Sequence, residues 1–384
     1  DKDGRKMSKH LGNVLEPMAL MDQHGADAVR WYMLAAGSPW SARRVGHDAI
    51  SDVVRKTLLT YWNTISFHSL YAQASSFDLS QSPARNTRPV MDRWIISELS
   101  ILINEVEQCL TNFDSQGAGK ALAQFIDDLS NWYVRRSRRR FWDGDVAALA
   151  TLHECLTTLT QLLAPMVPFI SEHVWQELVR PVDPTATKSV HLSDFPVANP
   201  SDIDTILSGQ VALTRRIVEL GRAARAESGI KIRQPLSRAL IAASGWAALP
   251  SDMREQIADE LNVADLADIA NADGDLVDIS VKANFRSLGA KFGGEVQAIA
   301  KAIAATDATA LVKTLRSSGS AQVGTWSIEL DDLVITEVPR TGWMVASHEG
   351  ESVAAVMMVE GYGAMRTTLV GDKRGIFCGM GVCF

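Results

Sequence analysis

The sequence has only four cysteines, Cys109, Cys155, Cys378 and Cys383, in 384 residues. None belongs to a CxxC pair, and none has a histidine at metal-ligand spacing. This spacing argues against a disulfide framework and against a zinc site within the chain. We therefore expect no metal ligands here and a reducing, cytoplasmic environment.

The sequence also lacks the marks of a membrane or secreted protein. No run of about 18 apolar residues occurs, so we expect no membrane-spanning helix. The first residues, DKDGRK, contain no apolar core and do not form a signal peptide. No Ser/His/Asp arrangement and no Gly-rich Walker loop is present. Because the chain starts with Asp and Met7 lies inside a motif, we interpret it as a piece of a longer protein.

Charge is unevenly distributed around a formal net charge of −7. Residues 251–280 hold nine acids and one base, whereas residues 215–238 hold seven bases against two acids. Residues 135–140 hold five arginines. Since polyanion binding depends on local basic surface, the negative total does not exclude a nucleic-acid partner.

The apolar pattern predicts a mainly α-helical protein. Pro17 and Gly25 mark the start and end of a short helix, and a second helix is expected over 26–36. From about 48 to 180, apolar residues recur at three and four positions, as in helices that bury one face in a bundle. Residues 181–204 read as a linker with one extended stretch at 190–192.

A smaller α+β domain is expected after the linker, beginning with a helix over about 203–228. The expected strands are 238–243, 276–282, 326–330 and 333–338, and the expected helices are 251–262, 291–304 and 307–316.

The strongest chemical signal is Lys6-Met7-Ser8-Lys9-His10, followed by Leu11-Gly12-Asn13. Two ammonium groups three residues apart on a loop can both reach a triphosphate and neutralise the leaving pyrophosphate. Lysine suits this role because it is a point charge on a flexible stem. A solvated basic loop is the alternative interpretation.

The second signal is an arginine-rich helix with interleaved aromatic residues over 130–142. Arginine can hold phosphates bidentately and stack on bases, which favours RNA contact. Alternatively, arginine stems cover apolar surface and some heads pair with Asp127 or Asp128 inside the bundle. The candidates for RNA contact are Arg135, Arg136, Arg138 and Arg139.

A third basic segment joins a helix carrying Arg222 and Arg225 to a turn carrying Lys231 and Arg233. It is compatible both with an edge that follows a phosphate backbone and with a solvated helix face.

These motifs together resemble the class I aminoacyl-tRNA synthetases. KMSKH is similar to the KMSKS signature of that class, with His10 in place of the last serine. Residues 25–30 resemble the helical connection after the signature loop, and residues 129–142 and 163–169 resemble the anticodon-binding bundle. Residues 229–236 and 282–289 resemble the isoleucyl-tRNA synthetase family of the longer, eukaryote-like type found in some bacteria. The resemblance extends to about residue 353.

The resemblance implies a reaction and its sites. Isoleucine would be activated by ATP with Mg²⁺ and transferred to tRNA(Ile), in a cytoplasmic enzyme that is a monomer at full length. Lys6 and Lys9 would be catalytic, and Lys9, Lys6 and Ser8 would contact ATP. The tRNA would be held by Arg135, Arg136, Arg138, Arg139, Arg222, Arg225, Lys231 and Arg233. Zinc would be possible only in the full-length enzyme.

The resemblance also implies a domain order. The expected domains are the end of a Rossmann-type catalytic domain at 1–47, the anticodon-binding bundle at 48–180, a linker at 181–204 and an α+β tRNA-binding domain at 205–353. The HIGH signature, the isoleucine pocket and the editing domain should lie upstream. We therefore expect this chain alone to be inactive.

Residues 354–384 do not follow the family pattern. They contain six glycines and two of the four cysteines but no helical or alternating stripe. A change of reading frame and a genuine divergent tail both explain this composition, and in either case we expect disorder.

Two hypotheses remain open from the sequence. The chain is either the C-terminal part of such a synthetase or a non-catalytic RNA-binding or scaffolding protein that retains its tRNA-binding domains. The lysine loop favours the synthetase, since a binding module needs no ATP loop. The valine enzyme is the nearest competitor within the class, because the choice depends on the stretch 284–289.

Overall fold

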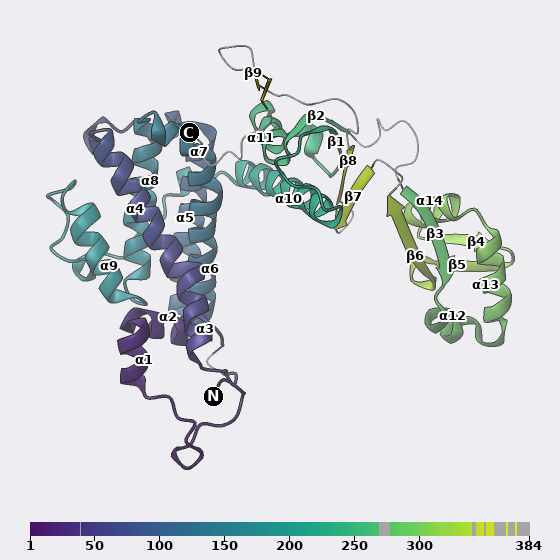
Figure 1. Cartoon of the computed structure of the whole chain (residues 1–384), viewed down its shortest axis with the longest axis horizontal. Coiled ribbons are helices and arrows are strands. Elements are labelled where there is room, and N and C mark those ends of the chain that lie inside the picture. Colours follow the sequence, from purple (N-terminus) through teal and green to yellow (C-terminus); the bar gives the residue numbers. More distant parts are fainter. Residues whose placement is uncertain are drawn as a thin grey trace. The chain divides into compact units, whose positions relative to one another are not determined.

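The computed structural model describes residues 1–38, 40–268, 277–339, 343–348, 351–356, 366–367 and 373–374. They form two compact units, Asp1–Ser208 and Gly209–Phe384. The first unit is helical, and every strand that the structure describes belongs to the second (Figure 1).

The first unit begins with a loop that leads into three helices, α1 (Pro17–His24), α2 (Ala26–Ala35) and α3 (His47–Val53). Pro17 occupies the first turn of α1, where its missing N–H costs nothing. Gly25 separates α1 from α2 with a φ of 86°, a conformation that favours glycine. Both short helices and the break between them are confirmed.

A helical bundle follows, and it confirms the helical pattern expected over 48–180. Its helices are α4 (Leu59–Ala74), α5 (Val90–Thr111), α6 (Ser115–Asp127), α7 (Arg135–Trp142), α8 (Val146–Leu163) and α9 (Pro168–Val174). Wider π-helical turns are inserted at η2 (Val54–Leu58), η5 (Asp128–Val134) and η6 (Trp175–Val179). The largest fully buried side chains include Trp94, Leu122, Tyr133, Phe141 and Leu152.

One continuous helical segment, α6–η5–α7, runs from Ser115 to Trp142. At 1.5 Å per residue it is roughly 40 Å long. Its start packs on α2, where a Cβ at Gly119 would lie 2.3 Å from the Cβ of Ala35. Glycine therefore permits this close approach, and α2 and the end of α7 lie at opposite ends of the bundle (Figure 1).

A buried ion pair fixes the end of α7. Asp92 is fully buried and accepts hydrogen bonds from both terminal nitrogens of Arg140, at 2.6 and 2.8 Å, and from the Tyr133 hydroxyl at 2.9 Å. Arg140 also donates to Asp145 at 2.8 Å. The partner of Arg140 is thus Asp92, whereas the sequence had suggested Asp127 or Asp128 as partners for some arginines of this helix.

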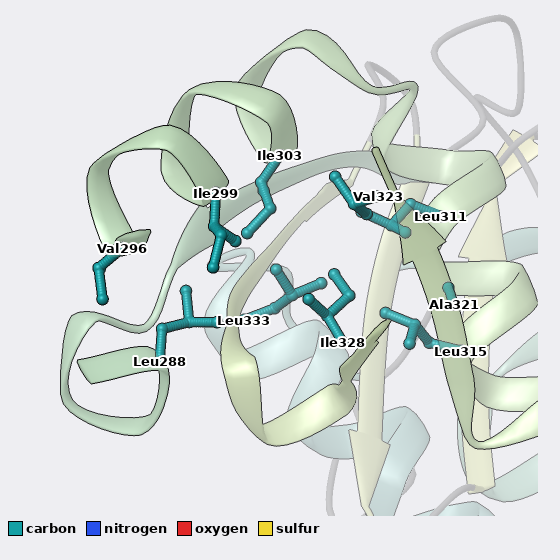
Figure 2. Close-up of a cluster of buried hydrophobic side chains, with 10 residues drawn as sticks. All are labelled: Leu288, Val296, Ile299, Ile303, Leu311, Leu315, Ala321, Val323, Ile328 and Leu333. Atoms are coloured by element: carbon teal, nitrogen blue, oxygen red, sulfur yellow. The ribbon is translucent and has the colours of Figure 1, made fainter. Parts of the chain in front are cut away.

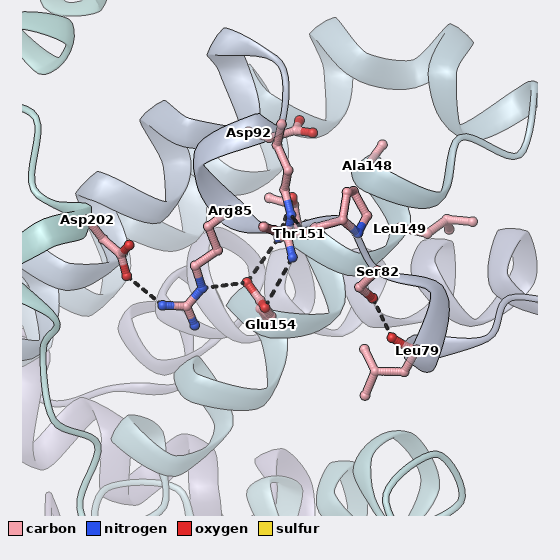
Figure 3. Close-up of polar contacts among 12 residues, drawn as sticks. Leu79, Ser82, Arg85, Asp92, Ala148, Leu149, Thr151, Glu154 and Asp202 are labelled. Atoms are coloured by element: carbon pink, nitrogen blue, oxygen red, sulfur yellow. Dashed lines mark hydrogen bonds and ion pairs between the residues drawn. The ribbon is translucent and has the colours of Figure 1, made fainter.

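A second polar centre joins the connection before α5 to α8. Arg88 is 5% exposed and donates to both carboxylate oxygens of Glu154, at 3.0 and 3.3 Å. Arg85 bridges Glu154 and Asp202 (Figure 3). Glu154 therefore ties the segment before α5, and through Arg85 the linker after α9, to the bundle.

The linker departs from the prediction at 190–192. That stretch is the short 3-10 helix η7 (Val190–Leu192), not an extended segment. Ser189 caps it by accepting the N–H of His191, and Val190 is 2% exposed. A capping serine followed by a buried anchor explains the turn.

Helix α8 is the one described helix that is long and apolar enough to cross a membrane. Two thirds of it is buried within this unit, as in the central helix of a bundle.

The second unit starts within α10 (Thr205–Glu227) and contains a four-stranded sheet of order β2-β1-β8-β7. β1 (Leu236–Ala242) pairs in parallel with β2 (Val263–Asp268), and α11 (Ser251–Leu261) lies between these two strands in the sequence. On its other side, β1 pairs antiparallel with β8 (Glu351–Val356). β7 spans Trp343–His348. The expected strand at 238–243 and helix at 251–262 are confirmed.

A second group of elements surrounds its own apolar core. β3 (Val277–Ala283) pairs with β6 (Leu333–Pro339), and β4 (Ser320–Val323) pairs with β5 (Trp326–Glu329). The helices are α12 (Phe285–Phe292), α13 (Val296–Ala305) and α14 (Ala308–Ser318). Figure 2 shows Ile299, Ile328 and Leu315 among the side chains that fill this core.

The predicted break after residue 353 does not coincide with the end of a strand. β8 continues to Val356, and Ala354 pairs with Leu240 of β1. Beyond it, the structure describes only β9 (Arg366–Thr367) and β10 (Lys373–Arg374). The disorder expected for the rest of 354–384 lies outside the described residues.

Two neutral histidines lie in the bundle core. The rings of His68 and His153 are 5.4 Å apart, and the residues are 2% and 3% exposed. Burial lowers the pKa of His68 to about 3 and that of His153 to about 4. Because both values lie below the value of about 6.5 for an unfolded chain, the unfolded state binds the protons first.

We therefore predict that the first unit is most stable above pH 6.5 and loses stability as the pH falls toward 4. At pH 5 the loss should be about 2 kcal/mol per histidine. Urea unfolding at pH 7, 6 and 5 measures it. His153→Phe should remove about half of the pH dependence, whereas the exposed His10→Ala should leave it unchanged. A pH dependence unaffected by His153→Phe would contradict this assignment.

Candidate nucleotide loop and RNA-binding surface

The lysine motif forms a closed loop stapled by two side chains. Ser8 caps the short 3-10 helix η1 (Lys9–Leu11) by accepting the N–H of Leu11 at 3.3 Å. Asn13 accepts the N–H of Ser8 at 2.9 Å and donates to the carbonyl of Lys6 at 3.2 Å. Gly12 ends η1 with a φ of 62°. The motif is therefore a shaped turn.

This turn leaves both lysine side chains exposed, on either side of Ser8. Beside it lies a cavity of about 610 Å³ lined by Gly12, Asn13 and Val14 from the loop and by Arg44 and His47 from the start of α3. The cavity is also lined by Asp1, Asp3 and Asp48, and neither Lys6 nor Lys9 lines it. The two exposed lysines themselves, rather than the cavity, suit the binding of an anionic ligand.

Two charged residues of α2, Asp27 and Arg30, attach this helix to the turn between α8 and α9. Asp27 accepts the backbone N–H groups of Phe169 and Ile170, at 3.4 and 2.7 Å, at the start of α9. Arg30 donates to the carbonyls of Pro165 and Met166, at 2.9 and 3.1 Å. Both contacts are electrostatically favourable, because a carboxylate stabilises the N-terminus of a helix and a cation stabilises the carbonyls at a C-terminus. We call these four contacts the α2 clamp.

The arginines of the arginine-rich helix differ in their exposure to solvent. Arg135, Arg138 and Arg139 are exposed, Arg136 is half-buried, and Arg140 is held by Asp92 as described above. Arg139 lies 3.9 Å from Asp143 in an exposed pair, which contributes little to stability. The structure therefore presents three of the four predicted RNA-contacting arginines on the outer surface of α7.

The third basic segment needs a correction at Arg225. This residue is 2% exposed, and its guanidinium donates to the carbonyls of Lys231, Gln234, Leu261 and Asn262, at 2.5 to 3.2 Å. Arg225 thus fixes the turn at 229–236 and the end of α11, and it is not accessible to a phosphate.

The other basic residues of this segment differ in their availability. Arg222 pairs with Glu260, which is 8% exposed. Lys231 and Arg233 are exposed on the turn that Arg225 holds. The apolar neighbours of Arg225 in the sequence give no sign of its burial.

The stretch 282–289 contains the end of β3, the helix cap Asn284 and the start of α12. Asn284 accepts the N–H groups of Arg286 and Ser287 and donates to the carbonyl of Asp331 at 2.8 Å. Asp332 is fully buried and accepts from Ser287 at 2.6 Å and from Lys291 at 3.0 Å.

Among the residues that the structure describes, no three His, Cys, Asp or Glu side chains are placed to share a metal ion.

Comparisons with known proteins match both the segment that contains the lysine loop and the segment that contains the arginine-rich helix. The family "Anticodon-binding domain of tRNA ligase" matches residues 92–240, and "tRNA synthetases class I (I, L, M and V)" matches residues 1–44. The isoleucine–tRNA ligase of Streptomyces coelicolor is 59% identical over 357 residues, covering 92% of this chain and 34% of that protein. The chain belongs to the isoleucine–tRNA ligase family.

More distant relatives carry the same name. The isoleucine–tRNA ligase of Thermobifida fusca is 56% identical over 366 residues, covering 92% of this chain and 34% of that protein. That of Deinococcus radiodurans is 38% identical over 361 residues, covering 92% of this chain and 32% of that protein. The chain thus spans about a third of the length of these relatives. Their names decide between the isoleucine and valine families.

Among solved structures, a crystal structure of the ternary complex of an Agrobacterium radiobacter K84 LeuRS with tRNA and LeuAMS is 22% identical. It covers 53% of this chain and 23% of its own, with a TM-score of 0.41 that is too low to carry an argument.

The α2 clamp generates a prediction for hydrogen exchange. Asp27→Ala should accelerate exchange of the Phe169 and Ile170 amides by about tenfold or more, since hydrogen bonds to charged groups contribute about 1.5–3 kcal/mol. Asp27→Asn should have a smaller effect, because the amide can still accept a hydrogen bond.

Hydrogen exchange followed by mass spectrometry of the first turn of α9 provides the readout. Asp22→Ala, at an exposed position of α1, is the matched control and should change nothing. Equal exchange in Asp27→Ala and the unaltered chain would rule out the clamp.

Proposed function

We propose that this chain supplies the ATP-contacting loop and the tRNA-binding domains of an isoleucine–tRNA ligase. The complete enzyme would join isoleucine to ATP, release pyrophosphate and transfer the isoleucyl group from the adenylate to tRNA(Ile). The observation that carries the proposal is the stapled lysine loop inside the class I synthetase match, in a chain 59% identical to such ligases.

The proposed division of labour follows the expected domains. Residues 1–47 would end the Rossmann-type catalytic domain, 48–180 would bind the anticodon, 181–204 would link, and the α+β residues 205–353 would hold tRNA. Isoleucine would bind outside this chain. As is typical of the family, the enzyme would work in the cytoplasm, and we expect a monomer. With about a third of the length of its relatives, the chain alone should not form the adenylate.

In the activation step, Lys6 and Lys9 would lie against the β- and γ-phosphates. Negative charge grows on the pyrophosphate as its bond to the α-phosphate breaks, and two fixed cations stabilise that charge. Ser8 would complete the contact with ATP while it caps η1.

The residues near the loop do not form an evident metal site. The Asp1 carboxylate accepts from the N–H groups of Asp3 and Arg5 and from Asn13. We therefore expect Mg²⁺ to arrive with ATP, and we assign no zinc ligands among the described residues.

For tRNA, the proposed contacts are Arg135, Arg136, Arg138 and Arg139 on α7, with Lys231, Arg233 and Arg222 in the second unit. Each phosphate contact releases counterions, so affinity should fall steeply with salt.

Lys9→Ala tests the catalytic part of the proposal in the complete enzyme. The rate of ATP–pyrophosphate exchange should fall by about 10²- to 10³-fold, as when one preorganised charge stabiliser is removed. The exposed Lys56→Ala is the control and should retain full rate. Unchanged exchange in Lys6→Ala/Lys9→Ala would contradict the phosphate role of the two lysines. Absence of exchange in the unaltered complete protein would instead support a non-catalytic RNA-binding protein.

Binding of tRNA(Ile) to the 384-residue chain tests the second part. Fluorescence anisotropy at 50 to 300 mM KCl should give a steep log–log slope, and Arg138→Ala/Arg139→Ala should reduce that slope by about one per lost phosphate contact. Arg55→Ala, an exposed arginine paired with Asp52, is the matched control. Binding that does not depend on salt would refute the proposed surface.

A further inference from the structure

The outer side of α7 carries one continuous stripe of exposed residues. Arg135, Arg138, Arg139 and Trp142 occupy positions i, i+3, i+4 and i+7, so they share one side of the helix. All four are exposed. On the opposite side, Ser137 and Phe141 are 2% and 1% exposed. We call these four residues the α7 stripe.

The structure fixes which way this stripe faces. Arg140 is anchored inward by Asp92 and Asp145, and Phe141 packs edge-on against Phe67 with ring centroids 5.2 Å apart. Gly144 then turns the chain with a φ of 69°, and its N–H bonds the carbonyl of Phe141 at 3.1 Å. The last turn of α7 is held from within, so the stripe cannot rotate into the bundle.

Trp142 is one of the tryptophans that the structure leaves exposed, and it is the one that lies beside arginines of α7. It is 72% exposed at the end of the stripe. Five others are at most 7% exposed and belong to the core, namely Trp31, Trp94, Trp132, Trp175 and Trp246. A large exposed aromatic ring beside arginines suits an occupant that is both flat and anionic.

An unpaired nucleotide has both properties. Its base offers a π-face to an aromatic ring, and its phosphates pair with arginine. The exposed ion pair of Arg139 with Asp143 can be exchanged for a phosphate at little cost. Bases inside a duplex are already stacked on both faces, so only a loop or an end can use such a platform.

We propose that Trp142 is a stacking platform for one unpaired base of the bound tRNA, with Arg138 and Arg139 holding the neighbouring phosphates. The proposal rests on the proposed tRNA binding and adds to it a residue that distinguishes loop from stem. A site at the far end of α6–η5–α7 from α2 also fits an elongated RNA whose other end reaches the lysine loop.

Two RNA hairpins and the 384-residue chain provide the test. One hairpin is the anticodon arm of tRNA(Ile), and the other has the same stem closed by a compact tetraloop. Trp142→Ala should weaken binding of the anticodon arm by about 5- to 150-fold, the range for loss of one base–aromatic stack. Tetraloop binding and the salt slope should stay unchanged, and Trp142→Phe should restore most of the affinity.

Trp40→Ala is the matched control, since Trp40 is 94% exposed between α2 and α3. It should change binding of neither hairpin. Arg138→Ala/Arg139→Ala should lower the salt slope for both. The platform is refuted if Trp142→Ala binds the anticodon arm as the unaltered chain does, which would leave Trp142 as a protein contact, or if it weakens both hairpins equally. If the unaltered chain binds no tRNA at all, the proposed function fails first.

Discussion

The α2 clamp is the contact on which the geometry of the first unit depends. Asp27 and Arg30 make four hydrogen bonds to the turn between α8 and α9. These bonds attach α2, the second helix after the lysine loop, to that turn. Close packing of Ala35 on Gly119 adds a second attachment to the start of α6. Because α6 continues into α7, the loop and the α7 stripe lie at opposite ends of one packed body (Figure 1). The proposed function, in which the complete enzyme acts on one end of an RNA and binds another part of it, is compatible with such a fixed separation.

Arginine serves two opposite purposes in this chain. Arg140, Arg88 and Arg225 point inward and satisfy a buried carboxylate, a half-buried carboxylate and four carbonyls, respectively. Each holds a helix end or a turn in place. The basic residues next to them are exposed. Arg138 and Arg139 precede Arg140, and Lys231 and Arg233 follow Arg225. Inward arginines thereby hold in place the helix end and the turn that carry the outward ones, which are the proposed RNA contacts.

Much of this could be predicted from the sequence, and the remainder fails for identifiable reasons. Pro17, Gly25 and the three- and four-residue apolar spacing predict the helices because they are local signals. The sequence missed the burial of Arg225, since two of the four carbonyls that accept its hydrogen bonds lie 36 and 37 residues away. It did not identify Asp92 as the partner of Arg140 for the same reason, because that pair spans 48 residues. The stretch 190–192, expected to be extended, is a 3-10 turn because the side chain of Ser189 caps it.

The most direct test of the central claim is ultraviolet cross-linking of tRNA(Ile) to the 384-residue chain, with the adducts located by mass spectrometry. The account predicts that anticodon-loop nucleotides attach to residues 135–142 and that other tRNA nucleotides attach to residues 229–236. Adducts found only on the largely buried helices α5 and α8, or only on the acidic segment 251–268, would contradict the claim that these two basic surfaces bind the RNA.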